Sequence, residues 1–404
     1  MAERPEIWVG IDVGKRTHHA CAVDAVGAVV FSEKFGNDQR LVEELIARAG
    51  QAAARVTLTV DLTGPLSLML VTVLLKAGQS VAYVPGCVVN SMSRGLRGEG
   101  KTDARDARVI AETARMRRDL VEVTMPEDLV AGLTQLTRYR TDLMGDWVAG
   151  VNRLRAVLGS IFPALEAAFD FSNRSPLISA ATLCTPAEIA GVGIDGVAGH
   201  LREKGVRASR IPKIAADAVA AAASQDIALP GEADAAVLVK RMAGKLLDLD
   251  REIKETDKLI TLRFRAHPWA RIIESLPGMG PGLGADFLVE TGGNLATFGS
   301  AGRLASYAGL VPVPRDSGRV NGNLRRPTRY NRRMRRVFYL AAFAGLRVEN
   351  GPSRRFYERK RAERLIHPQA LMSLARRLVD VLWALLRDGR EFVLQPPTAA
   401  GSAT

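Results

Sequence analysis

IWVGIDVGKRTHHACAVDAVGAVVF, residues 7–31, decides the fold predicted for the N-terminal part of this chain. Its apolar runs, residues 7–12 and 19–31, have the composition of β-strands, and residues 24–27 carry a hairpin signal. These elements indicate a mixed α/β domain. The elements predicted next are a helix near residues 40–48, a strand ending at residue 61, a helix over 65–76 and a strand over 80–85.

Four aspartates occupy distinctive places in this pattern. Asp12 lies in the first strand, Asp61 ends a later one, and Asp103 and Asp106 open a helix predicted over residues 103–116, where their spacing puts them on one face. An α/β RNase H-like (RuvC-like) fold has this order of elements: strand, hairpin, strand, helix, strand and acidic helix. In that fold, acids converge on the sheet to hold two divalent ions for phosphoryl transfer.

Carboxylate oxygens suit Mg²⁺ or Mn²⁺, so the sequence predicts that these four acids form a metal site. Each acid also has a structural explanation when taken alone. A strand-end Asp commonly forms a turn, and Asp103 suits a helix N-cap. The four together favour the metal site.

Long helices are predicted for the middle of the chain. Apolar residues follow three-four spacing over residues 129–158, interrupted by Arg140, and again over residues 239–260. Two such helices can pair within one chain or between two chains. The Ala-rich residues 215–236 are expected to form a surface linker or a weak helix.

Length and composition suggest a globular protein of several domains. With 404 residues, 47% of the residues hydrophobic and 25% charged, the chain exceeds what one hydrophobic core usually supports. No apolar run is long enough for a bilayer and no basic leader is present, so a cytoplasmic, nucleoid-associated protein is expected. The predicted domains are residues 1–125 (RNase H-like), 126–265 (helical, coiled-coil), 266–394 (basic, mainly α) and 395–404 (a disordered tail).

The positive charge is concentrated in one segment. The net charge of the chain is +13, and residues 301–365 hold 17 Arg or Lys against 4 Asp or Glu. Such clustering predicts a polyanion partner. The residues predicted to contact nucleic acid are Lys101, Arg319, Arg325, Arg326, Arg329, Arg332, Arg333, Arg335 and Arg336.

Two further motifs lie in or near this basic segment. Residues 276–290, LPGMGPGLGADFLVE, place Gly278 and Gly280 before an apolar helix, where backbone N–H groups can grip a phosphate, as in helix-hairpin-helix motifs. A purely structural tight turn explains them almost as well. Ser317 lies in a polar loop rich in arginines, which could neutralise a phosphate under attack. Judged from the residues alone, Ser317 is better explained as an ordinary loop serine.

Several motifs in the same order resemble one known family. WVGIDVGKRTHHACAVD, KTDARDA, VNRLRAVL and SLPGMGPGLGADFLVETGG resemble the insertion sequence 110 family (IS110/IS116/IS902-type, DEDD) of transposases over residues 7–160 and 270–350. The resemblance implies a RuvC-like domain whose metal-binding acids are Asp12, Asp61, Asp103 and Asp106, and a C-terminal transposase domain in which Ser317 attacks DNA. Asp61 departs from the family, which has a Glu there.

The resemblance also implies partners and leaves two rivals. The expected partners are DNA, a noncoding guide RNA in some relatives, and further copies of the chain in a homodimer or tetramer, with no membrane. One rival is a junction-resolving nuclease that uses only the acids. The other is an architectural DNA-binding protein without catalysis.

Overall fold

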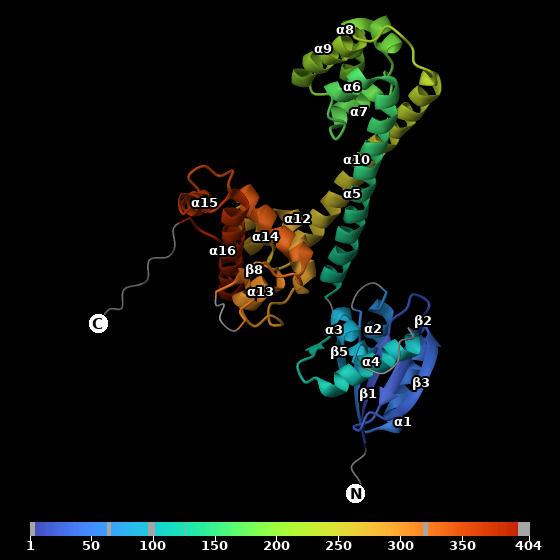
Figure 1. The fold of residues 1–404 in the computed structure, drawn as a ribbon, viewed down its shortest axis with the longest axis vertical. Coiled ribbons are helices and arrows are strands. Elements are labelled where there is room, and N and C mark those ends of the chain that lie inside the picture. Colours follow the sequence, from blue (N-terminus) through green and yellow to red (C-terminus); the bar gives the residue numbers. More distant parts are fainter. Residues whose placement is uncertain (1–4, 63–65, 96–101, 126, 318–321, 395–404) are drawn as a thin grey trace, which may run out of the picture. The chain divides into compact units, whose positions relative to one another are not determined.

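The protein consists of two compact units, Met1–Glu127 and Asp128–Thr404 (Figure 1). The computed structural model describes residues 5–62, 66–95, 102–125, 127–317 and 322–394. Lys101, Arg319 and the tail predicted at 395–404 lie outside the described residues. The domain boundaries expected from the sequence stay predictions.

The first unit is a sheet with helices on both faces. Its elements are β1 (Glu6–Asp12), β2 (Thr17–Val23), β3 (Val29–Gly36), α1 (Gln39–Ala52), β4 (Arg55–Val60), α2 (Leu68–Lys76), β5 (Val81–Tyr83), α3 (Gly86–Ser93), α4 (Asp103–Met116) and β6 (Val121–Glu122). All elements predicted for this part are present, and the helix predicted over residues 103–116 has these bounds. The short elements α3 and β6 were not expected.

The six strands are ordered β3-β2-β1-β4-β5-β6. The strands β1, β2 and β3 form an antiparallel meander, while β4 pairs in parallel with both β1 and β5. One face of the sheet packs against α1 and α2 around Val9, Leu45 and Leu74, and the other packs against α4 around Cys21 and Ala111. Strands β1 and β4 therefore end at the same edge, with α4 covering one face.

The second unit is almost entirely helical. Its elements are α5 (Asp128–Ile161), α6 (Pro163–Ala168), α7 (Arg174–Ala180), α8 (Pro186–Glu203), η1 (Ala208–Arg210), α9 (Ile211–Ala222), α10 (Glu232–Arg265), α11 (Ala270–Ser275), α12 (Pro281–Thr291), α13 (Ala301–Tyr307), β7 (Val313–Pro314), β8 (Leu324–Arg325), α14 (Arg332–Gly345), α15 (Pro352–Ala362) and α16 (His367–Asp388). The two long helices expected from the apolar spacing, α5 and α10, have 34 residues each.

The long helices pair with each other within the chain. Arg140, which interrupts the apolar spacing of α5, forms an ion pair with Asp257 of α10. Two hydrophobic cores lie along the pair: one joins it to α6–α9 around Phe162 and Val239, and the other joins α10 to α11–α16 around Phe264 and Phe338.

For residues 215–236, the linker alternative is wrong for most of the segment and the helix alternative is correct there. Residues up to Ala222 belong to α9, in which Ala215, Ala218 and Ala222 are buried, and α10 begins at Glu232. Alanine has a high helix propensity, and its small side chain lets helices approach closely, so an Ala-rich segment can serve as a core helix.

No helix in the described part of the chain has the length and hydropathy needed to cross a membrane.

Candidate functional site

A glycine in β1 brings α4 against the sheet. A Cβ on Gly10 would lie 2.3 Å from the backbone oxygen of Ala107 and 2.3 Å from the backbone nitrogen of Ala111. Only glycine permits this approach. Alternate residues of a strand face the same way, so Asp12 shares the face that packs on α4.

The direction of α4 places its acidic end near the ends of β1 and β4. At the C-terminal end of the helix, Arg115 donates to the carbonyl oxygen of Ala25, in the hairpin that joins β2 to β3, at 3.1 Å. This hairpin lies beside the start of β1, since Trp8 pairs with Val23. The N-terminus of α4, with Asp103 and Asp106 in its first turn, therefore lies at the edge where β1 ends.

The N-cap of α4 is Thr102, whose side chain accepts a hydrogen bond from the backbone N–H of Arg105 at 3.2 Å. The alternative explanation of Asp103 as the helix N-cap is therefore wrong. Asp103 instead follows the cap. Burial lowers the pKa of the His19 imidazole, and the nearby negative charge of Asp103 opposes this effect. His19 is the register partner of Asp12.

Asp61 lies beside Asp12 at the same edge. Gly10 of β1 is paired with Thr59 of the parallel strand β4. Asp12 and Asp61 each come two residues later, so they are neighbours on the same face of the sheet. The Oδ1 atom of Asp61 is buried and has no hydrogen-bond partner among the described residues. Burial raises the pKa of Asp61, the Val13 backbone N–H opposes this, and the charge of Asp106 raises the pKa further.

The structure thus gathers all four predicted acids at one edge of the sheet. They are not arranged as a closed metal site, because no group of three His, Cys, Asp or Glu side chains within the described ranges could hold a metal ion.

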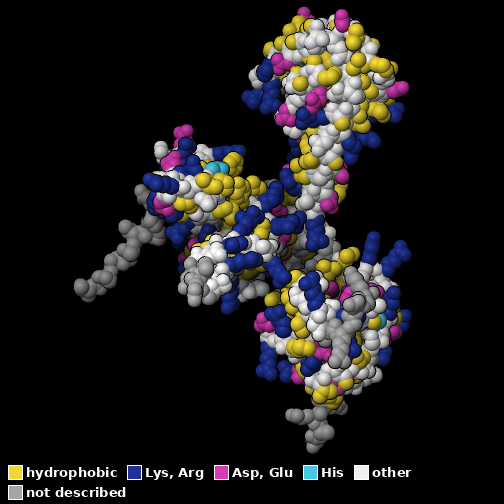
Figure 2. Space-filling view, viewed as in Figure 1, with side chains coloured by type: hydrophobic (Ala, Val, Ile, Leu, Met, Phe, Trp, Pro, Cys, Tyr) yellow, Lys and Arg dark blue, Asp and Glu magenta, His cyan; other side chains and the backbone are white. Residues whose placement is uncertain are grey.

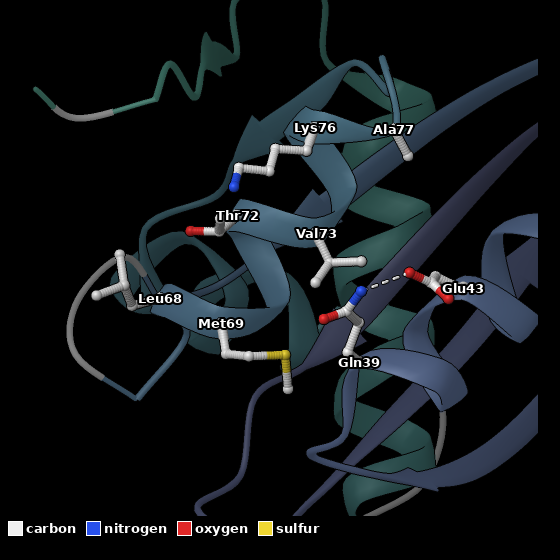
Figure 3. Close-up of a pocket in the computed structure, with 8 residues that line it drawn as sticks. All are labelled: Gln39, Glu43, Leu68, Met69, Thr72, Val73, Lys76 and Ala77. Atoms are coloured by element: carbon white, nitrogen blue, oxygen red, sulfur yellow. Dashed lines mark hydrogen bonds between the residues drawn. The ribbon is translucent and has the colours of Figure 1, made fainter.

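A separate groove lies on the opposite face of the sheet. It has a volume of about 610 Å³ and lies between α1 and α2 (Figure 3). Its polar lining includes Gln39, whose Nε2 donates to Glu43 Oε1 at 2.8 Å, together with Thr72 and Lys76. None of the four aspartates lines this groove.

Ser317 lies in the second unit, in the loop that joins the two strands of a short hairpin. Strands β7 and β8 pair antiparallel, and the Arg315 backbone N–H donates to the Asn323 carbonyl at 2.9 Å. The Asp316 carboxylate accepts from the backbone N–H of Asn323 at 3.0 Å. Ser317 comes next in the chain and is exposed to solvent.

The predicted nucleic-acid-binding arginines fall into two groups. Arg325, Arg329 and Arg332 are exposed and form no ion pair with any residue that the structure describes. Other arginines have partners within the protein: Arg333 pairs with Glu290 at 3.5 Å, Arg336 pairs with Asp286 at 3.5 Å, Arg335 lies 4.8 Å above the Tyr330 ring, and Arg326 donates to the Tyr330 hydroxyl at 2.6 Å. Lys and Arg side chains are frequent on the face of the second unit that Figure 2 shows (dark blue).

The two glycines of the predicted helix-hairpin-helix turn have different surroundings. Gly278 has a φ of 91°, and a Cβ there would lie 2.1 Å from the carbonyl oxygen of Ala341 in α14. This glycine is required for packing whether or not it meets a phosphate. Gly280 is the exposed N-cap of α12, with open space where a Cβ would project.

Comparison with known proteins identifies the family. A model for DEDD transposases of the IS110 type matches residues 9–163, and the model of the transposase IS116/IS110/IS902 family matches residues 270–358. The insertion element IS116 44.8 kDa protein of Streptomyces clavuligerus is 50% identical, over 97% of each chain. This chain belongs to the IS116/IS110/IS902 transposase family.

Other relatives are insertion element proteins too. The IS900 42 kDa protein of Mycobacterium paratuberculosis is 42% identical over 98% of this chain and 99% of its own, and the IS110 43.6 kDa protein of Streptomyces coelicolor is 30% identical over 97% and 96%. The resemblance seen in the motifs is confirmed, and the protein is a DNA transposase. Its DEDD domain implies an RNase H-like fold, in agreement with the mixed sheet, and is compatible with the use of a divalent metal.

Three residues around the serine-bearing loop of this transposase were not predicted from the sequence. Tyr307 ends α13, Asn331 caps α14, and Glu290 lies in α12, and the Asn331 side chain donates to both of the others. An Asn before an Arg-rich helix is a recognisable N-cap signal. The link to Glu290 has no local signal, because the two residues are distant in sequence.

Proposed function

We propose that this transposase cuts and rejoins DNA with a divalent-metal site formed by Asp12, Asp61, Asp103 and Asp106 and with Ser317 as the nucleophile. The observation that carries the proposal is the buried, unpartnered Oδ1 of Asp61 at the edge shared by the other acids. A buried carboxylate oxygen without a partner is costly, and a cation at this edge would compensate it.

The donor set fits Mg²⁺ or Mn²⁺, since all four groups are hard carboxylate oxygens. When bound, such an ion would lower the pKa of an attacking oxygen and neutralise charge on the phosphate. The chain itself places Asp12 and Asp61 at the ends of adjacent strands and Asp103 and Asp106 in one helical turn. Asp61 is shorter than the Glu that the family resemblance implies at this position but still supplies a carboxylate.

Ser317 supplies the covalent step in this proposal. Its Oγ gives up its proton and forms a bond to a DNA phosphorus, the bond from that phosphorus to one sugar oxygen breaks, and the departing oxygen takes up a proton. Rejoining reverses the step with a sugar hydroxyl of the new partner strand. Exposure of Ser317 gives a DNA strand access, and Arg315 and Arg325 on the hairpin supply positive charge nearby.

The exposed arginines serve as phosphate contacts in the same proposal. Phosphate contacts add affinity without sequence information, so Arg325, Arg329 and Arg332 suit DNA and equally a noncoding guide RNA. A homodimer or tetramer would hold the two duplexes that strand exchange requires. The junction-nuclease rival shares the acids and lacks the serine step, and the architectural rival lacks both.

Replacing the helix acids tests the metal site. Asp103→Asn with Asp106→Asn removes two ligand charges at constant shape, so transposition and the rise in melting temperature caused by Mn²⁺ should both be lost. Asp119→Asn is the matched control, because this aspartate of the same unit is exposed and pairs with Arg117. Normal transposition by the double variant would contradict the metal site.

A further inference from the structure

The two ends of the loop that carries Ser317 lie next to each other in the second unit. This loop runs from the end of α13 to the start of α14, and Asn331 joins these ends. The Asn331 backbone N–H donates to the Tyr307 carbonyl at 2.7 Å, and its side-chain Nδ2 donates to the Tyr307 hydroxyl at 2.6 Å. The base of the loop is therefore closed by two hydrogen bonds from one residue.

A third hydrogen bond ties this base to the core. Asn331 Nδ2 also donates to Glu290 Oε2 at 2.5 Å. The Glu290 side chain is 13% exposed and pairs through its other oxygen with Arg333, which in turn donates to Thr141 Oγ1 of α5 at 3.2 Å. A hydrogen bond to a largely buried carboxylate is stronger than one between neutral groups. The loop base is thus joined to α12 and, through Arg333, to α5.

The first and last residues of the loop also pack together. Gly309 has a φ of 66°, and a Cβ there would lie 2.5 Å from the ring carbon Cγ of Tyr330. Arg326 and Arg335 both lie over the Tyr330 ring, at 5.6 and 4.8 Å from its centroid. These contacts hold the two ends of the loop together.

We infer that Asn331 and Glu290 are positioning residues that set the place of Ser317 for attack on DNA. This inference rests on the proposed function of Ser317. Holding the two ends of a loop together limits the positions that its residues can reach. A reacting group must be held within a fraction of an ångström of its productive position. Neither side chain has to touch DNA for this role.

The two functions of Asn331 can be separated by substitution. Its Oδ1 accepts from the Met334 backbone N–H at 2.8 Å and caps α14, whereas its Nδ2 makes the two side-chain bonds at the loop base. Asn331→Asp keeps the cap, removes the donor and places a second carboxylate beside Glu290. Adding Glu290→Gln reverses the direction of the hydrogen bond between the two side chains, because the new amide can donate to Asp at position 331. The double variant also has the net charge of the wild type.

The test measures covalent attachment to a suicide DNA substrate at saturating DNA, together with DNA affinity and melting temperature. Asn331→Asp should slow attachment by about 10- to 100-fold, the size of effect that a displacement near 1 Å produces, without loss of the folded state. The double variant should recover the rate of Glu290→Gln alone, which keeps an acceptor for Asn331. Tyr307→Phe removes only a hydroxyl from the loop base and should slow attachment less.

Two results would overturn the inference. The first is covalent attachment by Asn331→Asp at the wild-type rate. The second is a double variant that attaches to DNA as slowly as Asn331→Asp although its melting temperature equals that of the wild type. If Asn331→Asp does not fold, a wild-type rate in Tyr307→Phe overturns the inference in its place. Failure of wild-type protein to attach DNA at Ser317 would overturn the proposed function first and this inference with it.

Discussion

Substitution of Gly10 tests whether the approach of α4 to β1 sets the acid cluster. In Gly10→Ala the new Cβ would meet two backbone atoms of α4 at 2.3 Å, the oxygen of Ala107 and the nitrogen of Ala111. Backbone atoms cannot rotate away as a side chain can. An ordinary contact requires about 3.4 Å, so the helix has to move by roughly 1 Å, which is the overpacking case.

The magnitude follows from this displacement. Overpacking in a well-packed core costs about 1–3 kcal/mol of the free energy of unfolding. Because Asp103 and Asp106 begin the displaced helix, they move relative to Asp12 on the strand. A shift of this size at a reacting centre can cost about 100-fold in rate. We therefore expect Gly10→Ala to remain folded, with a lower melting temperature and a much larger loss of transposition.

The assay compares thermal unfolding with transposition of the element in cells. Gly50→Ala in α1 is the matched control, because a Cβ at this exposed helix position meets no atom within 4 Å. That control should be stabilised by roughly 0.5–1 kcal/mol, since alanine is the better helix residue, and it should transpose normally. Normal transposition by Gly10→Ala would show that the place of α4 does not set the geometry of the acids.

Two further predictions concern charged side chains. Without metal, Asp61→Asn should raise the melting temperature, because it removes a buried charge. It should also abolish the stabilisation by Mg²⁺ that is expected of the wild type, whereas Asp61→Glu should retain that stabilisation and transposition. If Mg²⁺ stabilises Asp61→Asn as well as the wild type, Asp61 is not a ligand. Replacing both Arg329 and Arg332 with Gln should lower the log-log salt slope of DNA binding by roughly one unit per lost phosphate contact. By contrast, Arg336→Gln, which breaks the ion pair with Asp286, should change this slope less. An unchanged slope in the first variant would exclude those two phosphate contacts.

Much of the first unit could be predicted from the sequence because its signals are local. Strand composition, the hairpin residues and the acidic first turn of α4 are all properties of short segments, and they placed Asp12, Asp61, Asp103 and Asp106 in the correct element order. The close approach at Gly10 could not be predicted, because it depends on which helix covers the strand.

The basic domain shows the limit of local signals. The charge count predicts a polyanion surface, but it does not separate Arg332, which is exposed, from Arg333 and Arg336, which pair with acids of α12. Those acids are distant in sequence and come close only through the packing of α12 on α14. The same holds for Gly278, whose turn packs on the backbone of α14.

The most direct test of the account is the chemical fate of Ser317. Wild-type transposase is incubated with Mg²⁺ and a suicide DNA substrate carrying its element end, denatured and digested with protease, and the peptides are analysed by mass spectrometry. The account predicts a peptide with nucleotide attached through phosphate to Ser317, which is absent from Ser317→Ala protein that still binds the DNA. Cut DNA without any such peptide would contradict the serine step and favour a nuclease that uses the acids alone.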